Sequence, residues 1–117
     1  MTALAFSKDH LFAGEGPILK IYSRHDDRLI ESITVFSSQA IHGIAIHSGG
    51  IIVWGGRLVT LYAFTPAECS VLSRSSSFEA ADWILDISVS PEVSGQKQKA
   101  ALLTAHNALL LLSRIHI

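Results

Sequence analysis

Gly43-Ile44-Ala45-Ile46-His47 alternates small and apolar residues, and the chain carries this pattern three times. The first copy is Ala3-Leu4-Ala5-Phe6-Ser7, and the third is Asp86-Ile87-Ser88-Val89-Ser90. The centres of the copies lie at positions 5, 45 and 88, so successive copies are 40 and 43 residues apart. Alternation with a period of two is typical of β-strands, and regular spacing of this length indicates an internal structural repeat.

Two further apolar runs follow each copy, separated by residues that favour turns. The second runs are Leu11–Gly14, Ile51–Gly55 and Leu102–His106, and the third are Ile18–Tyr22, Leu58–Tyr62 and Leu109–Leu112. More polar fourth segments at Leu29–Phe36 and Cys69–Ser73 fit a half-exposed edge strand, and Ser75-Ser76-Ser77 is expected to be an exposed connector. Gly, Pro or Asn at 14–17, 55–56 and 106–107 allows tight turns. The sequence therefore predicts units of four, four and three strands.

Repeats of this length with four short strands each are typical of WD40-type β-propellers. We expect an all-β fold, a WD40-like β-propeller segment with about two complete four-stranded antiparallel blades plus a three-stranded third, not a closed ring. The domain spans 1–117, with units at 3–36, 41–73 and 82–116. The Gly-His and Trp-Asp dipeptides of that repeat are absent, and Tyr22 and Tyr62 stand roughly where its Trp would be.

The composition agrees with an incomplete ring. The 117 residues are 49% hydrophobic and 16% charged, against about 25% charged in an average soluble domain, and the mean hydropathy is +0.38. Propellers close with four to eight blades, so an unclosed stack leaves an apolar flank at each end. We expect further propeller blades or another protein chain to cover these flanks, which accounts for the apolar excess.

Charge and cysteine content narrow the function classes. A net charge of −1 provides no overall field for nucleic acid. A single cysteine and the absence of zinc-like Cys/His spacing favour a reducing compartment. Apolar runs fall far short of the roughly 20 residues that span a bilayer. The expected location is cytoplasmic, without membrane insertion.

Five groups of residues carry a resemblance to a known family. They are Leu11-Phe12-Ala13-Gly14-Glu15-Gly16-Pro17, Ile18–Ser23, Ile41-His42-Gly43, Asp82-Trp83-Ile84-Leu85-Asp86 and Ala105-His106-Asn107. In order and spacing they resemble the N-terminal region of the WD-repeat protein six family, over nearly the whole chain. Members of that family continue through many more blades than this chain holds.

The resemblance implies a non-catalytic role in tRNA processing. Members of the family pair with a tRNA 2′-O-ribose methyltransferase and direct it to the wobble nucleotide of the anticodon loop, and members have been linked to endosomal recycling. The implied partners are the methyltransferase and tRNA. Two alternatives stay open: a general protein–protein interaction scaffold, for instance in endosomal trafficking, and a truncated fragment without independent function.

The candidate interaction residues follow from the strand order. In an up-and-down blade, the turns between the second and third strands share an edge with the links into the next blade. This edge is expected to gather Glu15, His42, Arg57, Asp82, Trp83, His106 and Asn107. These residues either bond turn backbone in a purely structural role or form a surface that contacts a partner.

Catalysis and cofactor binding have little support in the sequence. The six histidines lack metal-ligand spacing, there is no G-x-S-x-G element, and the Gly-Gly pairs lack the lysine of a phosphate loop. We expect no catalytic residue, cofactor or metal. Trp54 is expected in the core between blades, and Trp83 either in the core or on the interaction face.

Overall fold

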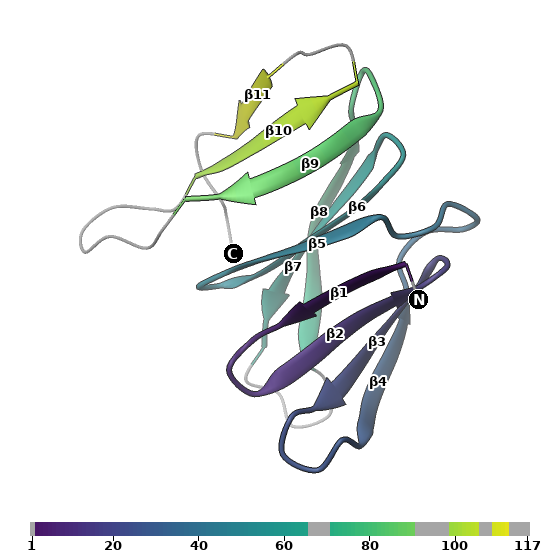
Figure 1. Cartoon of the computed structure of the whole chain (residues 1–117), viewed down its shortest axis with the longest axis vertical. Helices are drawn as coiled ribbons and strands as arrows, with labels where there is room; N and C mark the ends of the chain where they lie inside the picture. The colour runs from purple at the N-terminus through teal and green to yellow at the C-terminus, as the bar shows by residue number, and fades with distance from the viewer. Residues whose placement is uncertain (1, 66–70, 91–98, 106–108, 113–117) are drawn as a thin grey trace.

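Three antiparallel sheets make up the described part of the chain (Figure 1). The computed structural model describes residues 2–65, 71–90 and 99–105 in full, together with the backbone of 109–112. Blade 1 consists of β1 (Ala3–Phe6), β2 (His10–Glu15), β3 (Ile18–Ser23) and β4 (Leu29–Thr34). Blade 2 consists of β5 (Gly43–His47), β6 (Gly50–Gly55), β7 (Leu58–Phe64) and β8 (Leu72–Glu79). Blade 3 consists of β9 (Ile84–Val89), β10 (Ala100–Thr104) and β11 (Leu109–Leu112).

The strands of each sheet pair in sequence order, as in the blades of a propeller. β1 contacts β5, and β5 contacts β9, so the first strands of the three blades line up side by side. β4 and β8 form the opposite edges of their sheets (Figure 1). The predicted all-β segment of four, four and three strands is confirmed, and the ring is open.

Two apolar clusters hold neighbouring blades together, and we call them seam 1–2 and seam 2–3. Seam 1–2 contains Phe12, Leu19, Ile21, Val35, Phe36, Ile41, Ile51, Val53, Tyr62 and Leu72. Seam 2–3 contains Ile52, Trp54, Val59, Leu61, Ala80, Ile84, Ile87, Ala100 and Leu102. Blade 2 contributes to both seams because alternate residues of its strands point to opposite faces. The prediction that Trp54 lies between blades is confirmed, since it is 6% exposed in seam 2–3.

Backbone hydrogen bonds tie each link to the preceding blade at equivalent positions. The Ile41 N–H donates to the Gly16 carbonyl at 2.8 Å, and the Ile84 N–H donates to the Gly56 carbonyl at 2.8 Å. Gly16 and Gly56 have φ of 59° and 58°, a backbone conformation that glycine adopts without strain. The expectation that these turns share an edge with the interblade links is therefore confirmed.

The predicted bounds of one strand are wrong. The fourth strand of blade 2 is Leu72–Glu79 rather than the expected 69–73, and Ser75-Ser76-Ser77 lies within it instead of forming a connector. The strand is exposed from Ser73 to Glu79 and pairs with β7 through its backbone. Because backbone hydrogen bonds hold this edge strand and its side chains are exposed, serine is tolerated there despite its preference for turns. Residues 69, 70, 106 and 107 lie outside the described residues.

His47, at the end of β5, is a buried titratable group. The residue is 5% exposed, and its Nδ1 accepts a hydrogen bond from the Gly49 N–H at 3.2 Å. Burial lowers the pKa of His47 below its usual value of 6.5. The folded state therefore favours the neutral imidazole.

We expect the free energy of unfolding to fall as the pH drops below about 6.5, because the unfolded chain then binds a proton that folded His47 resists. The stability that neutral His47 contributes is complete above the pKa of this residue in the unfolded chain. It is lost as the pH falls toward the lower pKa of His47 in the folded chain. His47→Asn keeps an acceptor for Gly49 but cannot titrate, so it should flatten the pH dependence between pH 7.5 and 5. Urea unfolding at several pH values measures this, with exposed His25→Asn as the control. If the stability of His47→Asn and of the unmutated chain depends on pH to the same extent, His47 is not the group responsible.

Candidate interaction face

An exposed pair of aromatic rings marks the edge where blades 2 and 3 meet. The rings of His42 and Trp83 stack with centroids 6.4 Å apart and an interplanar angle of 20°. His42 directly precedes β5, and Trp83 directly precedes β9, so the two residues occupy equivalent places in successive repeats. Trp83 is 54% exposed, which places it on the surface rather than in the core.

Hydrogen bonds hold the His42 ring and the main chain of Trp83 in place. The Gly56 N–H donates to Nδ1 of His42 at 3.2 Å, so His42 spans from its own link to the turn between β6 and β7. The Trp83 N–H donates to a carboxylate oxygen of Asp82 at 2.8 Å, and the Trp83 carbonyl accepts from the Ala105 N–H at 2.9 Å. His42 and Asp82 thus form hydrogen bonds with backbone groups, as the structural alternative expects, and the Trp83 side chain stays exposed.

Charged groups of both signs flank the rings. Arg57, in the β6–β7 turn, forms a 3.0 Å ion pair with Glu79 at the end of β8, and both side chains are about half exposed. The neighbouring Gly56 carbonyl accepts the Ile84 N–H, and the Arg57 carbonyl accepts the Ala80 N–H at 2.7 Å. The link carrying Asp82 and Trp83 is thereby held against this turn. We call His42, Arg57, Glu79, Asp82 and Trp83 the Trp83 face.

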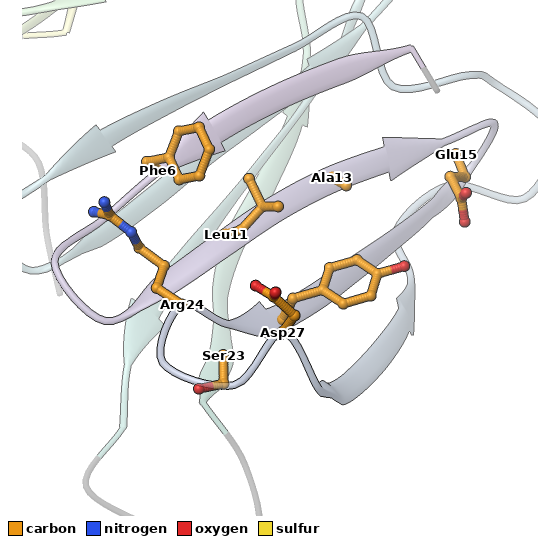
Figure 2. A pocket seen from close by; sticks show the side chains of 8 residues that line it. Phe6, Leu11, Ala13, Glu15, Ser23, Arg24 and Asp27 are labelled. Atoms are coloured by element: carbon orange, nitrogen blue, oxygen red, sulfur yellow. The ribbon is translucent and has the colours of Figure 1, made fainter.

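Glu15 belongs to a different surface. It lies at the end of β2 and pairs with Lys20 at 2.5 Å. The hydrogen bond from Lys20 is the main cause that lowers the pKa of Glu15 and raises that of Lys20. Glu15 lines a hollow on the outer face of blade 1 (Figure 2). His106 and Asn107, the remaining predicted face residues, lie outside the described residues.

The side chains of the Trp83 face can make apolar, aromatic and polar contacts. Two exposed stacked rings on a hydrogen-bonded scaffold offer apolar area and a π surface, and the adjacent ion pair offers polar contacts. Within the described residues, no group of three or more His, Cys, Asp or Glu side chains lies close enough to hold a metal ion. The described residues also form no helix long and apolar enough to cross a membrane.

Sequence reasoning missed Glu79, because it follows the serine run that was assigned to a connector. It also did not single out several exposed apolar residues of blades 1 and 3, among them Leu4, Phe6, Leu85 and Leu103. The repeat itself carries the missing signal. Leu4 and Phe6 lie 40 positions before Ile44 and Ile46, which pack against seam 1–2.

Comparison with known proteins supports the fold. No family model matches the sequence, and no curated protein matches it either. Among solved structures, the chain is similar to the β-propeller domain of Cps50 (Swd1) from Myceliophteria thermophila, with a TM-score of 0.60 and 15% identity. The match covers 96% of this chain and 40% of that one. The computationally designed Ika4 protein also matches, with a TM-score of 0.47, 10% identity, and coverage of 97% of this chain and 91% of that one.

The first of these similarities concerns the fold alone. The chain spans about 40% of the length of the Cps50 propeller domain. The similarity agrees with the three sheets, their strand order and the two seams. The chain therefore has the fold of an open β-propeller segment.

Proposed function

We propose that this chain is a non-catalytic scaffold within an auxiliary subunit that directs a tRNA 2′-O-ribose methyltransferase to the wobble position. The role in tRNA methylation rests on the sequence motifs around Glu15, His42 and Trp83, which resemble those of the WD-repeat protein six family. The observation that carries the scaffold role is the exposed Trp83–His42 stack on a rigid blade edge. Loops and links on such a framework commonly carry binding.

The charges of the Trp83 face favour protein over tRNA as its direct contact. Phosphate contacts need unpaired basic groups, and tRNA binding by such contacts is strongly dependent on salt. Arg57 is paired with Glu79, and Asp82 adds a second carboxylate beside the rings. An exposed tryptophan with mixed charges around it is typical of an anchor for a protein partner. We therefore assign this face to the methyltransferase and leave tRNA contact to other surfaces of the complex.

The mechanism is positional. A scaffold that binds the enzyme and positions it over the anticodon loop raises the effective concentration of the two reactants and restricts their orientation. The methyl transfer takes place entirely within the partner enzyme. The residues of this chain supply rigidity, through the two seams, and a contact surface, through the Trp83 face.

Trp83→Ala is the first test of this proposal. We expect the variant to fold, because Trp83 is more than half exposed, and to lose at least tenfold in affinity for the methyltransferase. The first measurement is quantitative co-purification from cells that express the gene product containing this chain. The second is the level of wobble 2′-O-methylation in a strain that lacks the unmutated gene product and expresses the variant.

Phe78→Ala is the matched control, because Phe78 is an exposed aromatic on β8 and is not one of the two stacked rings. It should leave co-purification and methylation unchanged. The proposal fails if the unmutated gene product captures neither a ribose methyltransferase nor tRNA and its deletion leaves wobble methylation intact.

A general protein-interaction scaffold is the second candidate, and the mixed charge of the Trp83 face favours it as well. The same co-purification separates the two. Capture of other proteins that depends on Trp83, with wobble methylation unaffected, would identify this second role. Capture of the methyltransferase that depends on Trp83 would support the first.

A further inference from the structure

A groove opens between blades 1 and 2, at the end of the blades opposite the Trp83 face. The β1–β2, β3–β4 and β5–β6 turns lie at this end, because consecutive strands run in opposite directions (Figure 1). The groove has a volume of about 680 Å³, within the range of ligand sites in proteins. Its two walls come from two consecutive blades of this chain. We call it the seam groove.

The wall from blade 2 is apolar and carries no lysine, arginine or carboxylate. It consists of Ile46, His47, Phe64, Thr65 and Val71. Ile46, Phe64 and Val71 pack against seam 1–2, so this wall is the open end of that core. Nδ1 of His47 accepts the Gly49 N–H, so the neutral ring carries its proton on Nε2 and is a hydrogen-bond donor rather than a charge. This wall therefore suits aliphatic side chains of a ligand.

The wall from blade 1 carries the charged groups. It consists of Ser7, Lys8, Asp9, His10, Arg28 and Ile30. Lys8 and Arg28 are exposed, and within the described residues neither side chain forms an ion pair. The Asp9 carboxylate, in contrast, lies 3.4 Å from Nε2 of His25. The charge that this wall offers to a ligand is therefore positive.

Hydrogen bonds hold both walls in position. The Val71 N–H donates to the Glu31 carboxylate of β4 at 3.0 Å and so joins blade 2 to blade 1 beside the groove. The turn that carries Lys8 is closed by the Ser7 N–H, which donates to the His10 carbonyl at 2.8 Å. The Arg24 guanidinium donates to the Ser7 carbonyl at 2.8 Å. A site that is already ordered loses little conformational entropy when a ligand binds.

We propose that the seam groove binds an extended acidic peptide segment of a partner protein. Its carboxylates face Lys8 and Arg28, and its aliphatic side chains face the blade 2 wall. Successive side chains of an extended chain point to opposite sides. A segment that alternates acidic and aliphatic residues therefore matches one positive wall and one apolar wall at the same time.

The charges of the groove favour a peptide over RNA. Binding to a phosphate backbone depends on several unpaired basic groups. The seam groove offers two, Lys8 and Arg28, and the carboxylates of Asp9 and Glu31 lie beside them. Two cations are enough for the alternate carboxylates of a short acidic segment. The proposal concerns a second surface and does not rest on the assignment of the Trp83 face to the methyltransferase.

Fluorescence anisotropy with a labelled peptide of about eight residues, alternating glutamate and leucine, tests the proposal. The protein is the purified gene product that contains this chain. We expect saturable binding that weakens as salt is added, because salt screens exposed charge pairs. The double variant Lys8→Glu, Arg28→Glu should bind at least about tenfold more weakly, since two attractions become repulsions. A peptide alternating lysine and leucine should show the same loss with the unmutated protein.

Lys99→Glu is the matched control, because Lys99 is an exposed cation on blade 3 that does not line the groove. It should leave peptide affinity unchanged. Ile30→Ser removes apolar area from the groove without changing its charge, and Ile30 is 39% exposed, so this variant should fold. It should weaken binding about threefold. It also provides the test if the double variant does not retain the circular dichroism of the folded protein.

Three results would overturn the proposal. They are no binding of the acidic peptide at about 200 µM, equal affinity of the folded double variant and the unmutated protein, and equal affinity for the acidic and basic peptides. If the double variant loses affinity for an anticodon stem–loop RNA but not for the acidic peptide, the groove is an RNA site instead. Co-purification of the methyltransferase through Trp83 is measured separately, so failure here and failure of the proposed function are distinguishable.

Discussion

Replacing Gly55 by alanine is expected to lower the free energy of unfolding by about 3 kcal/mol, through overpacking at a backbone contact. A Cβ at this position would lie 2.0 Å from the carbonyl oxygen of Ala40, in the link between blades 1 and 2. The link has little room to move, because the Ile41 N–H bonds to Gly16 and the His42 N–H bonds to the Trp54 carbonyl. Relieving the clash must break bonds to one blade or the other.

Gly16→Ala is the matched control for this prediction. Gly16 has a positive φ of 59°, but nothing lies within 4 Å of the position that its Cβ would take. The substitution should cost about 1 kcal/mol, the strain of alanine in the left-handed conformation. Urea unfolding of both variants measures the difference. If Gly55→Ala is as stable as Gly16→Ala, the Ala40 carbonyl does not pack closely against position 55.

The order of the strands could be predicted from sequence because each blade repeats the same pattern of buried residues. Apolar alternation around positions 5, 45 and 88 fixed the first strand of each blade, and the Gly turns at 16 and 56 fixed the next two. The fourth strand of blade 2 escaped this reasoning. Its side chains from Ser73 to Glu79 face solvent, so no burial pattern marks it, and its position comes from backbone pairing with β7.

The candidate face could be predicted in part, by topology rather than by chemistry. His42, Asp82 and Trp83 share an edge because each lies in a link that enters a blade. The sequence left open whether Trp83 points inward, since a tryptophan before a strand suits either position. The stack on His42, which belongs to the preceding repeat, settles its direction, and the bond from Gly56 holds the His42 ring. Glu15 occupies the equivalent turn of blade 1, but its side chain lines the hollow on the outer face of that blade.

Truncation of Trp54 to alanine should have the largest effect on stability, about 3–5 kcal/mol. The indole is buried in seam 2–3 and lies directly on Gly43, where an added Cβ would come within 2.1 Å of the ring. Gly43 has no side chain that can fill the space, so a cavity remains between blades 2 and 3. Chemical denaturation of the chain measures the loss.

The place where the Trp54→Ala chain is destabilised is as informative as the size of the stability loss, because a blade in an open stack contacts only its neighbours. Hydrogen exchange of Trp54→Ala should show β9 and β10 losing protection first, while β2 and β3 keep theirs. Phe12→Ala is the mirror-image control. Phe12 is fully buried in seam 1–2 and stacks on Phe64 at 6.4 Å, so its removal should free blade 1 and spare blade 3. If both variants instead lose protection uniformly, the three blades unfold as one unit, and the two seams do not act as separable interfaces.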